Sequence, residues 1–141
     1  MIAYIDSSVL LRLVLNQPPT LVEWPLLTGG IASPLLAVEC HRTLDRYWRE
    51  NLLTDEVYAA KRQETETVLS RLERVALDDT ILRVAAQPFP TIVRTLDAIH
   101  LASAIAYRAA QPGDERPLLF ATHDTQLARA ARAMNFEVIG A

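Results

Sequence analysis

Residues 2–15 read IAYIDSSVLLRLVL, and this stretch decides the fold. The uninterrupted apolar run at 2–5 predicts a short strand that is buried in the protein. Residues 7–15 predict a helix that follows at once, with Ser7 or Ser8 as its N-cap. A buried strand leading directly into a helix is the repeating unit of an α/β protein with a parallel sheet.

The same alternation continues toward the C-terminus. Further strands are predicted at 29–33, 75–78, 118–121 and 136–140. Helices are predicted at 20–27, 34–50, 54–73, 79–86, 95–110 and 125–134, with loops at 87–90 and 111–117. Ser33 and Pro34 are placed as N-cap and first residue of one helix. The pattern predicts a single domain over residues 1–141, of the α/β class, with three layers (α/β/α) and a mostly parallel central sheet.

Composition narrows the class of protein further. The chain has 141 residues, of which 50% are hydrophobic, so it has enough apolar surface to build one core. Its single cysteine, Cys40, excludes an internal disulfide and a cysteine-rich zinc site. The net charge of −3 argues against a surface that is basic throughout. With no signal peptide and no membrane-length apolar run, we expect a soluble cytoplasmic protein without a membrane partner.

Four acidic residues interrupt or end apolar stretches: Asp6, Glu39, Asp97 and Asp124. An ionised carboxylate near the core costs free energy unless another group pairs with it. Several carboxylates close together raise one another's pKa, which adds to that cost. A divalent cation removes the conflict, and carboxylate oxygens suit Mg²⁺ or Mn²⁺.

The predicted elements bring these four acids to one place. Asp6 directly follows the first strand and Asp124 closely follows the strand at 118–121, so both belong to the edge where parallel sheets bind ligands. Glu39 shares a helix face with the leucines three and four residues before it, so it points inward. Asp97 lies in the first turn of the apolar helix at 95–110, near the same edge.

Each acid taken alone also has a simpler interpretation. Asp6 and Asp124 can cap the helices that follow them. Asp97 can complement a helix dipole, and Glu39 can pair with Arg42 or face solvent. These interpretations do not explain why all four acids fall at one end of one sheet, which favours a metal site.

The chain resembles the PIN-domain nucleases and, among them, the VapC-type toxins of bacterial toxin–antitoxin pairs. The resemblance covers nearly the whole chain and keeps the order of the acids, with spacings of 33, 58 and 27 residues between successive members. The motifs that carry it are Asp6-Ser7-Ser8, Ser33-Pro34 with Glu39 and Arg42, Leu96-Asp97-Ala98-Ile99-His100-Leu101-Ala102, and Thr122-His123-Asp124.

The resemblance implies an endoribonuclease that depends on Mg²⁺ or Mn²⁺ and cleaves RNA phosphodiester bonds with a metal-activated water. Asp6, Glu39, Asp97 and Asp124 would be both the catalytic residues and the metal ligands. The partners implied are an RNA substrate, a cognate antitoxin and a second copy of the chain in a homodimer.

Three further residues are predicted to support this site. Ser7 and Thr122 match family positions where a hydroxyl assists the acidic cluster, although each can equally serve a turn or helix end. Arg94 is predicted to meet substrate phosphate, to neutralise the acids, or to be solvated.

His100 and four aromatic residues have two interpretations each. His100 follows Asp97 by three residues, within reach of the site, but a buried apolar helix favours a core histidine with satisfied hydrogen bonds. The aromatic residues can be core or can line the groove that accepts the antitoxin in VapC-like proteins. They are Trp24, Tyr47, Trp48 and Tyr58.

Three other classes of protein fit less well. A phosphatase of the haloacid dehalogenase type needs a second aspartate two residues after the first, where this chain has Ser8. A phosphoacceptor receiver domain needs a site lysine, and Lys61 is the only lysine. A PIN-like module that binds RNA or protein without cleaving it remains the alternative; a missing acid would be its signature, and no acid is missing.

Overall fold

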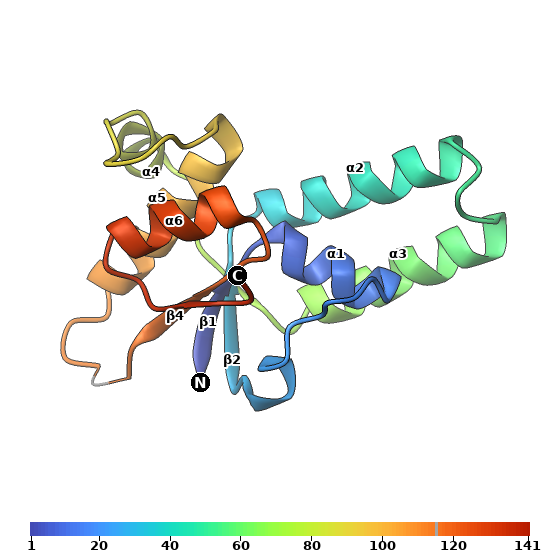
Figure 1. The fold of residues 1–141 in the computed structure, drawn as a ribbon, viewed down its shortest axis with the longest axis horizontal. Coiled ribbons are helices and arrows are strands. Elements are labelled where there is room, and N and C mark those ends of the chain that lie inside the picture. The colour runs from blue at the N-terminus through green and yellow to red at the C-terminus, as the bar shows by residue number, and fades with distance from the viewer. Residues whose placement is uncertain (115) are drawn as a thin grey trace.

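The computed structural model describes residues 1–114 and 116–141, and within them the chain forms a three-layer α/β/α structure (Figure 1). The elements in chain order are β1 (Ile2–Ile5), α1 (Ser7–Leu15), the 3-10 helix η1 (Trp24–Leu26), β2 (Gly29–Ala32), α2 (Leu35–Arg49), α3 (Asp55–Leu69), β3 (Glu73–Arg74), α4 (Asp79–Ala85), α5 (Thr95–Ala109), β4 (Leu118–Ala121), α6 (Thr125–Ala133) and β5 (Val138–Ile139).

The five strands form one sheet in the order β3-β2-β1-β4-β5, and every neighbouring pair is parallel. The predicted fold class is therefore confirmed, with a sheet that is parallel throughout. Alternate residues of the central strand β1 point to opposite faces, as the two-residue period of a strand requires. Ile5 packs against α1, α2 and α3, whereas Tyr4 packs against α5 and α6. Figure 1 also shows α2 and α3 running beyond the sheet as a two-helix arm.

One predicted strand was misplaced. The strand expected at 75–78 lies at Glu73–Arg74, where it pairs with Ile31 and Ala32 of β2. Both of its residues are exposed, so this short edge strand has no apolar pattern to reveal it. Val75 still donates its N–H to the carbonyl of Ala32, and the chain then leaves the sheet to start α4.

Several predicted boundaries also move. The helix expected at 20–27 is only the 3-10 turn η1, which contains Pro25, and α3 ends at Leu69 rather than near 73. The strand expected at 136–140 shortens to the two residues of β5. Of the loop expected at 111–117, residue 115 lies outside the described residues.

The helix caps differ from those expected near the site. Asp6 is the N-cap of α1, as the capping interpretation of this residue predicted, in place of Ser7 or Ser8, and its side chain accepts the N–H of Ser8. The helix after β2 begins at Leu35 with Pro34 in the cap position, while the hydroxyl of Ser33 accepts the N–H of Leu35. The carboxylate of Asp6 at this position accepts a free N–H group of the first helical turn, and the helix dipole favours its negative charge.

The strand order creates a crevice beside β1. The chain passes from β1 to β2 and β3 on one side, then returns to β4 on the other side of β1. Such a reversal opens a crevice at the carboxyl ends of the strands, where α/β proteins bind ligands. Ile5 pairs with Ala121, so the next residues of the two strands, Asp6 and Thr122, meet at this crevice.

Candidate active site: an acidic cleft at the ends of β1 and β4

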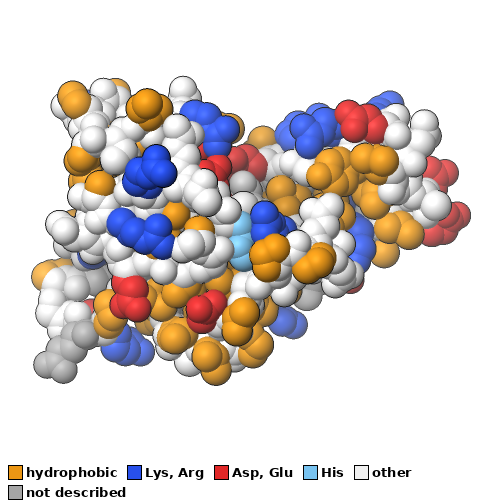
Figure 2. Space-filling model, in the orientation of Figure 1, with side chains coloured by type: hydrophobic (Ala, Val, Ile, Leu, Met, Phe, Trp, Pro, Cys, Tyr) orange, Lys and Arg blue, Asp and Glu red, His pale blue; other side chains and the backbone are white. Residues whose placement is uncertain are grey.

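The four acids predicted from the sequence line a single open cleft of about 730 Å³ at this crevice. Asp6 and Asp124 come from the ends of β1 and β4, whereas Glu39 and Asp97 come from α2 and α5. Figure 2 shows acidic side chains gathered in the notch between the body of the molecule and the arm of α2 and α3, with basic side chains beside them. The structure therefore brings together all four residues, although they span most of the chain.

Asp6 is held by three donors on one of its two oxygens. Its Oδ2 accepts hydrogen bonds from the hydroxyl of Ser8 at 2.6 Å, the hydroxyl of Thr122 at 2.9 Å and the N–H of Ser8 at 3.3 Å. The side chain is almost fully buried, with 3% exposed. These donors fix its orientation, and among the described residues they leave Oδ1 without a hydrogen-bond partner.

The two side-chain oxygens of Asp124 have different hydrogen-bond partners. Oδ1 accepts the N–H groups of Gln126 and Leu127 at 2.8 and 3.0 Å and so caps α6. Oδ2 accepts a hydrogen bond from Nη2 of Arg94 at 2.7 Å. The capping interpretation of Asp124 is therefore correct, and the same residue also lines the cleft.

Glu39 is connected to the core by a chain of buried hydrogen bonds, here called the relay. Its Oε1 is paired with Nε2 of His100, and Nδ1 of that ring lies 2.8 Å from the hydroxyl of Tyr4. The Tyr4 hydroxyl in turn accepts the N–H of Ser33 at 3.2 Å. Burial opposes charge on His100, but the hydrogen bond and charge of Glu39, together with Asp6 and Asp97, raise its pKa overall. The relay therefore fixes Glu39 through a buried side chain that never reaches the cleft surface.

Asp97 experiences the charge of its neighbours directly. Burial raises the pKa of this carboxyl, the negative charges of Asp6 and Asp124 raise it further, and Arg94 lowers it in part. Nε of Arg94 donates to Oδ2 of Asp97 at 3.3 Å. The negative charge around Asp97 is thus only partly offset by Arg94.

The acids do not form a ready-made chelate in this arrangement. Within residues 1–114 and 116–141, no three Asp, Glu, His or Cys side chains are placed to hold one ion. Three of the acids instead contact groups of the chain itself: Asp97 and Asp124 pair with Arg94, and Glu39 pairs with His100. The donor set nevertheless fits a hard cation, because it consists of carboxylate oxygens that share one cleft.

The predicted supporting residues lie near the acids in different ways. Thr122 contacts Asp6 directly, and the hydroxyl of Ser7 reaches Oε2 of Glu39 at 3.4 Å. Ser8, which the sequence analysis considered as a helix cap and not as a supporting residue of the site, makes the shortest contact with Asp6. Its signal was its place two residues after an N-cap aspartate, where side chain and backbone both face the cap. Arg46, also missed, lines the cleft from α2.

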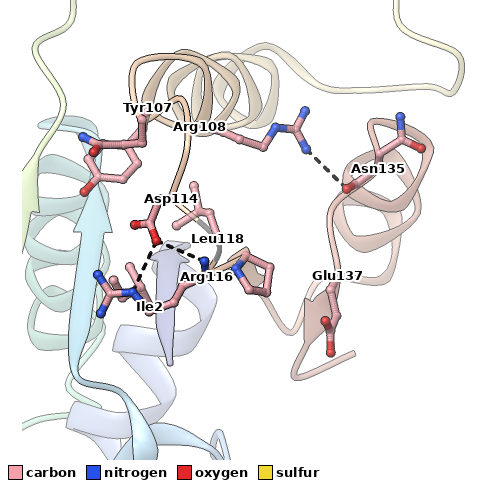
Figure 3. Close-up of a pocket in the computed structure, with 10 residues that line it drawn as sticks. Ile2, Tyr107, Arg108, Asp114, Arg116, Leu118, Asn135 and Glu137 are labelled. Carbon is pink, nitrogen blue, oxygen red and sulfur yellow. Dashed lines mark hydrogen bonds and ion pairs between the residues drawn. The ribbon is translucent and has the colours of Figure 1, made fainter.

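A second pocket of about 320 Å³ lies at the opposite edge of the sheet, beside Ile2 and Leu118, which begin β1 and β4 (Figure 3). Three of its charged side chains already have partners: Arg116 pairs with Asp114, and Arg108 donates to the carbonyl of Asn135. None of the four acids lines this pocket. The acidic cleft is therefore the candidate active site.

Comparison with known proteins agrees with this architecture. The PIN domain family matches residues 3–133, so the chain belongs to the PIN-domain family, as the sequence motifs predicted. Ribonuclease VapC47 of Mycobacterium tuberculosis (strain CDC 1551 / Oshkosh) is 26% identical over 140 residues, which cover 94% of this chain and 92% of that relative. Ribonuclease VapC35 of the same strain is 29% identical over 143 residues, covering 96% and 94%.

Solved structures show the same fold. FitAcB from Neisseria gonorrhoeae superposes with a TM-score of 0.65 at 17% identity, covering 98% of this chain and 96% of that chain. The structure of FitAB bound to an IR36 DNA fragment gives a TM-score of 0.63 at 14% identity, with 98% and 93% covered.

Proposed function

We propose that this protein is an endoribonuclease that depends on Mg²⁺ or Mn²⁺ and acts as the toxin of a toxin–antitoxin pair. The observation that carries the proposal is the convergence of Asp6, Glu39, Asp97 and Asp124 on one cleft. The names of the VapC ribonucleases, which match over more than nine tenths of the chain, support RNA as the substrate.

Asp6, Asp97, Glu39 and Asp124 would hold the cation. When bound, it would lower the pKa of a coordinated water and stabilise negative charge on the phosphate under attack. The donors around each acid then have a clear task. Ser8 and Thr122 fix the plane of the Asp6 carboxylate, and His100 fixes Glu39, so the free oxygens are oriented before any ligand arrives.

Arg46 is the residue of the cleft best placed to meet the RNA backbone. It lines the same cleft as the acids, and among the described residues it has no ion-pair partner. Its guanidinium lies 5.5 Å from the centre of the ring of Tyr47, the next residue of α2. Because an arginine pairs well with phosphate, we assign Arg46 to substrate binding.

The test is an RNA cleavage assay with purified protein and a panel of structured and single-stranded RNAs. We expect cleavage in Mg²⁺ or Mn²⁺ that stops when EDTA is added and returns when excess cation is restored. The Arg46→Gln variant should raise KM with a smaller change in kcat, since it loses a contact made in both the ground and transition states.

The alternative, a PIN-like module that binds RNA or protein without cleaving it, predicts the opposite result. RNA would then bind without any metal-dependent cleavage by the wild-type protein. The intramolecular partners of the acids are the feature that favours this alternative. Cleavage that persists unchanged in EDTA would instead reject the metal dependence.

We also propose the partners that the family resemblance implies, namely an antitoxin and a second copy of this chain, in the cytoplasm. No helix in the described parts of the chain is long and apolar enough to cross a membrane. The α2–α3 arm offers an apolar surface for a partner, since the rings of Trp48 and Tyr58 stack with their centres 4.8 Å apart and the nearby Leu52 is exposed.

Two measurements test these partners. Light scattering should give twice the monomer mass at micromolar concentration. A Leu52→Asp variant should lose capture of the co-expressed antitoxin while still cleaving RNA. A monomer throughout, or undiminished capture, would contradict these assignments.

A further inference from the structure

One arginine joins two of the cleft carboxylates across the fold. Arg94 precedes α5, and its guanidinium donates from Nε to Asp97 at 3.3 Å and from Nη2 to Asp124 at 2.7 Å. These two carboxylates come from different elements, α5 and the start of α6. Among the described residues, the guanidinium has no other hydrogen-bond or ion-pair partner.

Packing does not hold Arg94 in this position. Its side chain is 65% exposed, and its backbone is extended at the N-cap of α5 without a side-chain cap. The carboxylates therefore set the position of the guanidinium, whereas their own positions are set by α5 and by the capping of α6. The arginine can leave the cleft without disturbing the core.

A divalent cation and Arg94 need the same oxygens. The guanidinium contacts Oδ2 of Asp97 and Oδ2 of Asp124, and because Oδ1 of Asp124 caps α6, Oδ2 is the oxygen of Asp124 that is left for a cation. A doubly charged ion beside an arginine is also repelled electrostatically. The two positive groups are therefore alternative occupants of one negative cleft.

We propose that Arg94 competes with the metal ion for the cleft. To bind there, the metal ion must displace the Arg94 guanidinium from Asp97 and Asp124. This inference rests on the proposed metal-dependent function and adds a form of regulation to it. The arginine sets the concentration of free cation at which the cleft fills, and it protects the acids from mutual repulsion while the cleft is empty of metal.

The experiment is isothermal titration calorimetry, which measures the affinity of the RNA-free protein for Mn²⁺. Wild type is compared with three variants: Arg94→Gln, Arg94→Lys and Arg46→Gln. Two weak exposed ion pairs are lost in Arg94→Gln, so Mn²⁺ should bind roughly three- to tenfold more tightly. Arg94→Lys keeps the charge but loses the forked geometry, so its affinity should fall between those of Arg94→Gln and wild type. Arg46→Gln also removes one positive charge from the cleft, but at a residue that pairs with none of the carboxylates among the described residues. The affinity of this variant for Mn²⁺ should stay within about twofold of wild type.

Thermal unfolding gives a second readout that does not depend on cleavage. Without metal, Arg94→Gln should melt below wild type, because Asp97 and Asp124 lose their shared counter-charge. The rise in melting temperature on adding saturating Mn²⁺ should be larger for Arg94→Gln than for wild type.

The outcomes separate the two proposals. If wild type binds Mn²⁺ and cleaves RNA, but Arg94→Gln binds Mn²⁺ no more tightly than wild type or Arg46→Gln, the competition is rejected and the nuclease proposal stands. If wild type binds no Mn²⁺ at millimolar concentration, the metal-dependent function fails and the competition fails with it.

Discussion

The Asp6→Asn variant is expected to lose RNA cleavage by more than about a hundredfold while remaining folded. The side-chain oxygen of asparagine can keep the place of Oδ2 and the three hydrogen bonds from Ser8 and Thr122. Its NH₂ group then takes the place of Oδ1, the oxygen that has no hydrogen-bond partner among the described residues. A neutral amide donor at that position offers no lone pair or charge to a cation. The substitution thus changes the chemistry of the site and preserves its shape.

Two measurements make this result specific. Initial cleavage rates of Asp6→Asn are compared with those of Asp45→Asn, which makes the same change on α2 at a residue that does not line the cleft. We expect Asp45→Asn to cleave at about the wild-type rate. The melting temperature of Asp6→Asn should not fall, since removing its charge relieves the repulsion that raises the pKa of Asp97. Cleavage by Asp6→Asn at the wild-type rate would remove this residue from the catalytic set.

The His100→Leu variant is expected to destabilise the protein by about 2–4 kcal/mol and to lower activity as well. His100 is fully buried and satisfies both the carboxylate of Glu39 and the hydroxyl of Tyr4. Leucine fills a similar volume but supplies neither hydrogen bond. A half-buried carboxylate and a buried hydroxyl are then left with fewer partners than they have in the native fold. Urea denaturation measures the loss, and the cleavage rate reports whether Glu39 keeps its orientation.

Thr65→Val is the matched control for this substitution. Thr65 is also buried, but its hydroxyl donates only to the Lys61 carbonyl of its own helix, so the cost should stay below about 1 kcal/mol. Combining His100→Leu with Tyr4→Phe in a double-mutant cycle should give a coupling of about 0.5–3 kcal/mol. If His100→Leu unfolds at the same urea concentration as wild type, the relay does not stabilise the fold.

The sequence predicts the strands and helices that place the acids, because their signals are local. Residues 2–5 and 118–121 are short apolar runs that end just before Asp6 and Asp124, and a parallel sheet puts both run ends at one edge. Glu39 follows from helix periodicity. The edge strand Glu73–Arg74 cannot be predicted in this way, because it is a strand through its pairing with β2 and has no apolar pattern.

The contacts inside the cleft depend on distances that no local pattern encodes. Arg94 meets Asp124 across 30 residues, and Tyr4 meets His100 across 96, so both contacts require the packing of α5 against the rest of the fold. The motif around Asp97 places His100 one turn away. A buried His100 with satisfied hydrogen bonds is the interpretation that the sequence favours and the structure confirms, but the motif does not identify Tyr4 and Glu39 as its partners.

The hydrogen bond between Thr122 and Asp6 closes a loop of 116 residues, and this has a consequence for synthesis of the chain. Of the five described strands, the central strand β1 is synthesised first, and Asp6 at its end has no Thr122 to pair with until β4 has been made. Until β4 and the start of α6 emerge, Asp6 lacks Thr122 and the cleft lacks Asp124. A growing chain therefore carries only a partial cleft, and the acidic site is completed only after β4 and the start of α6 have been synthesised and have left the ribosome.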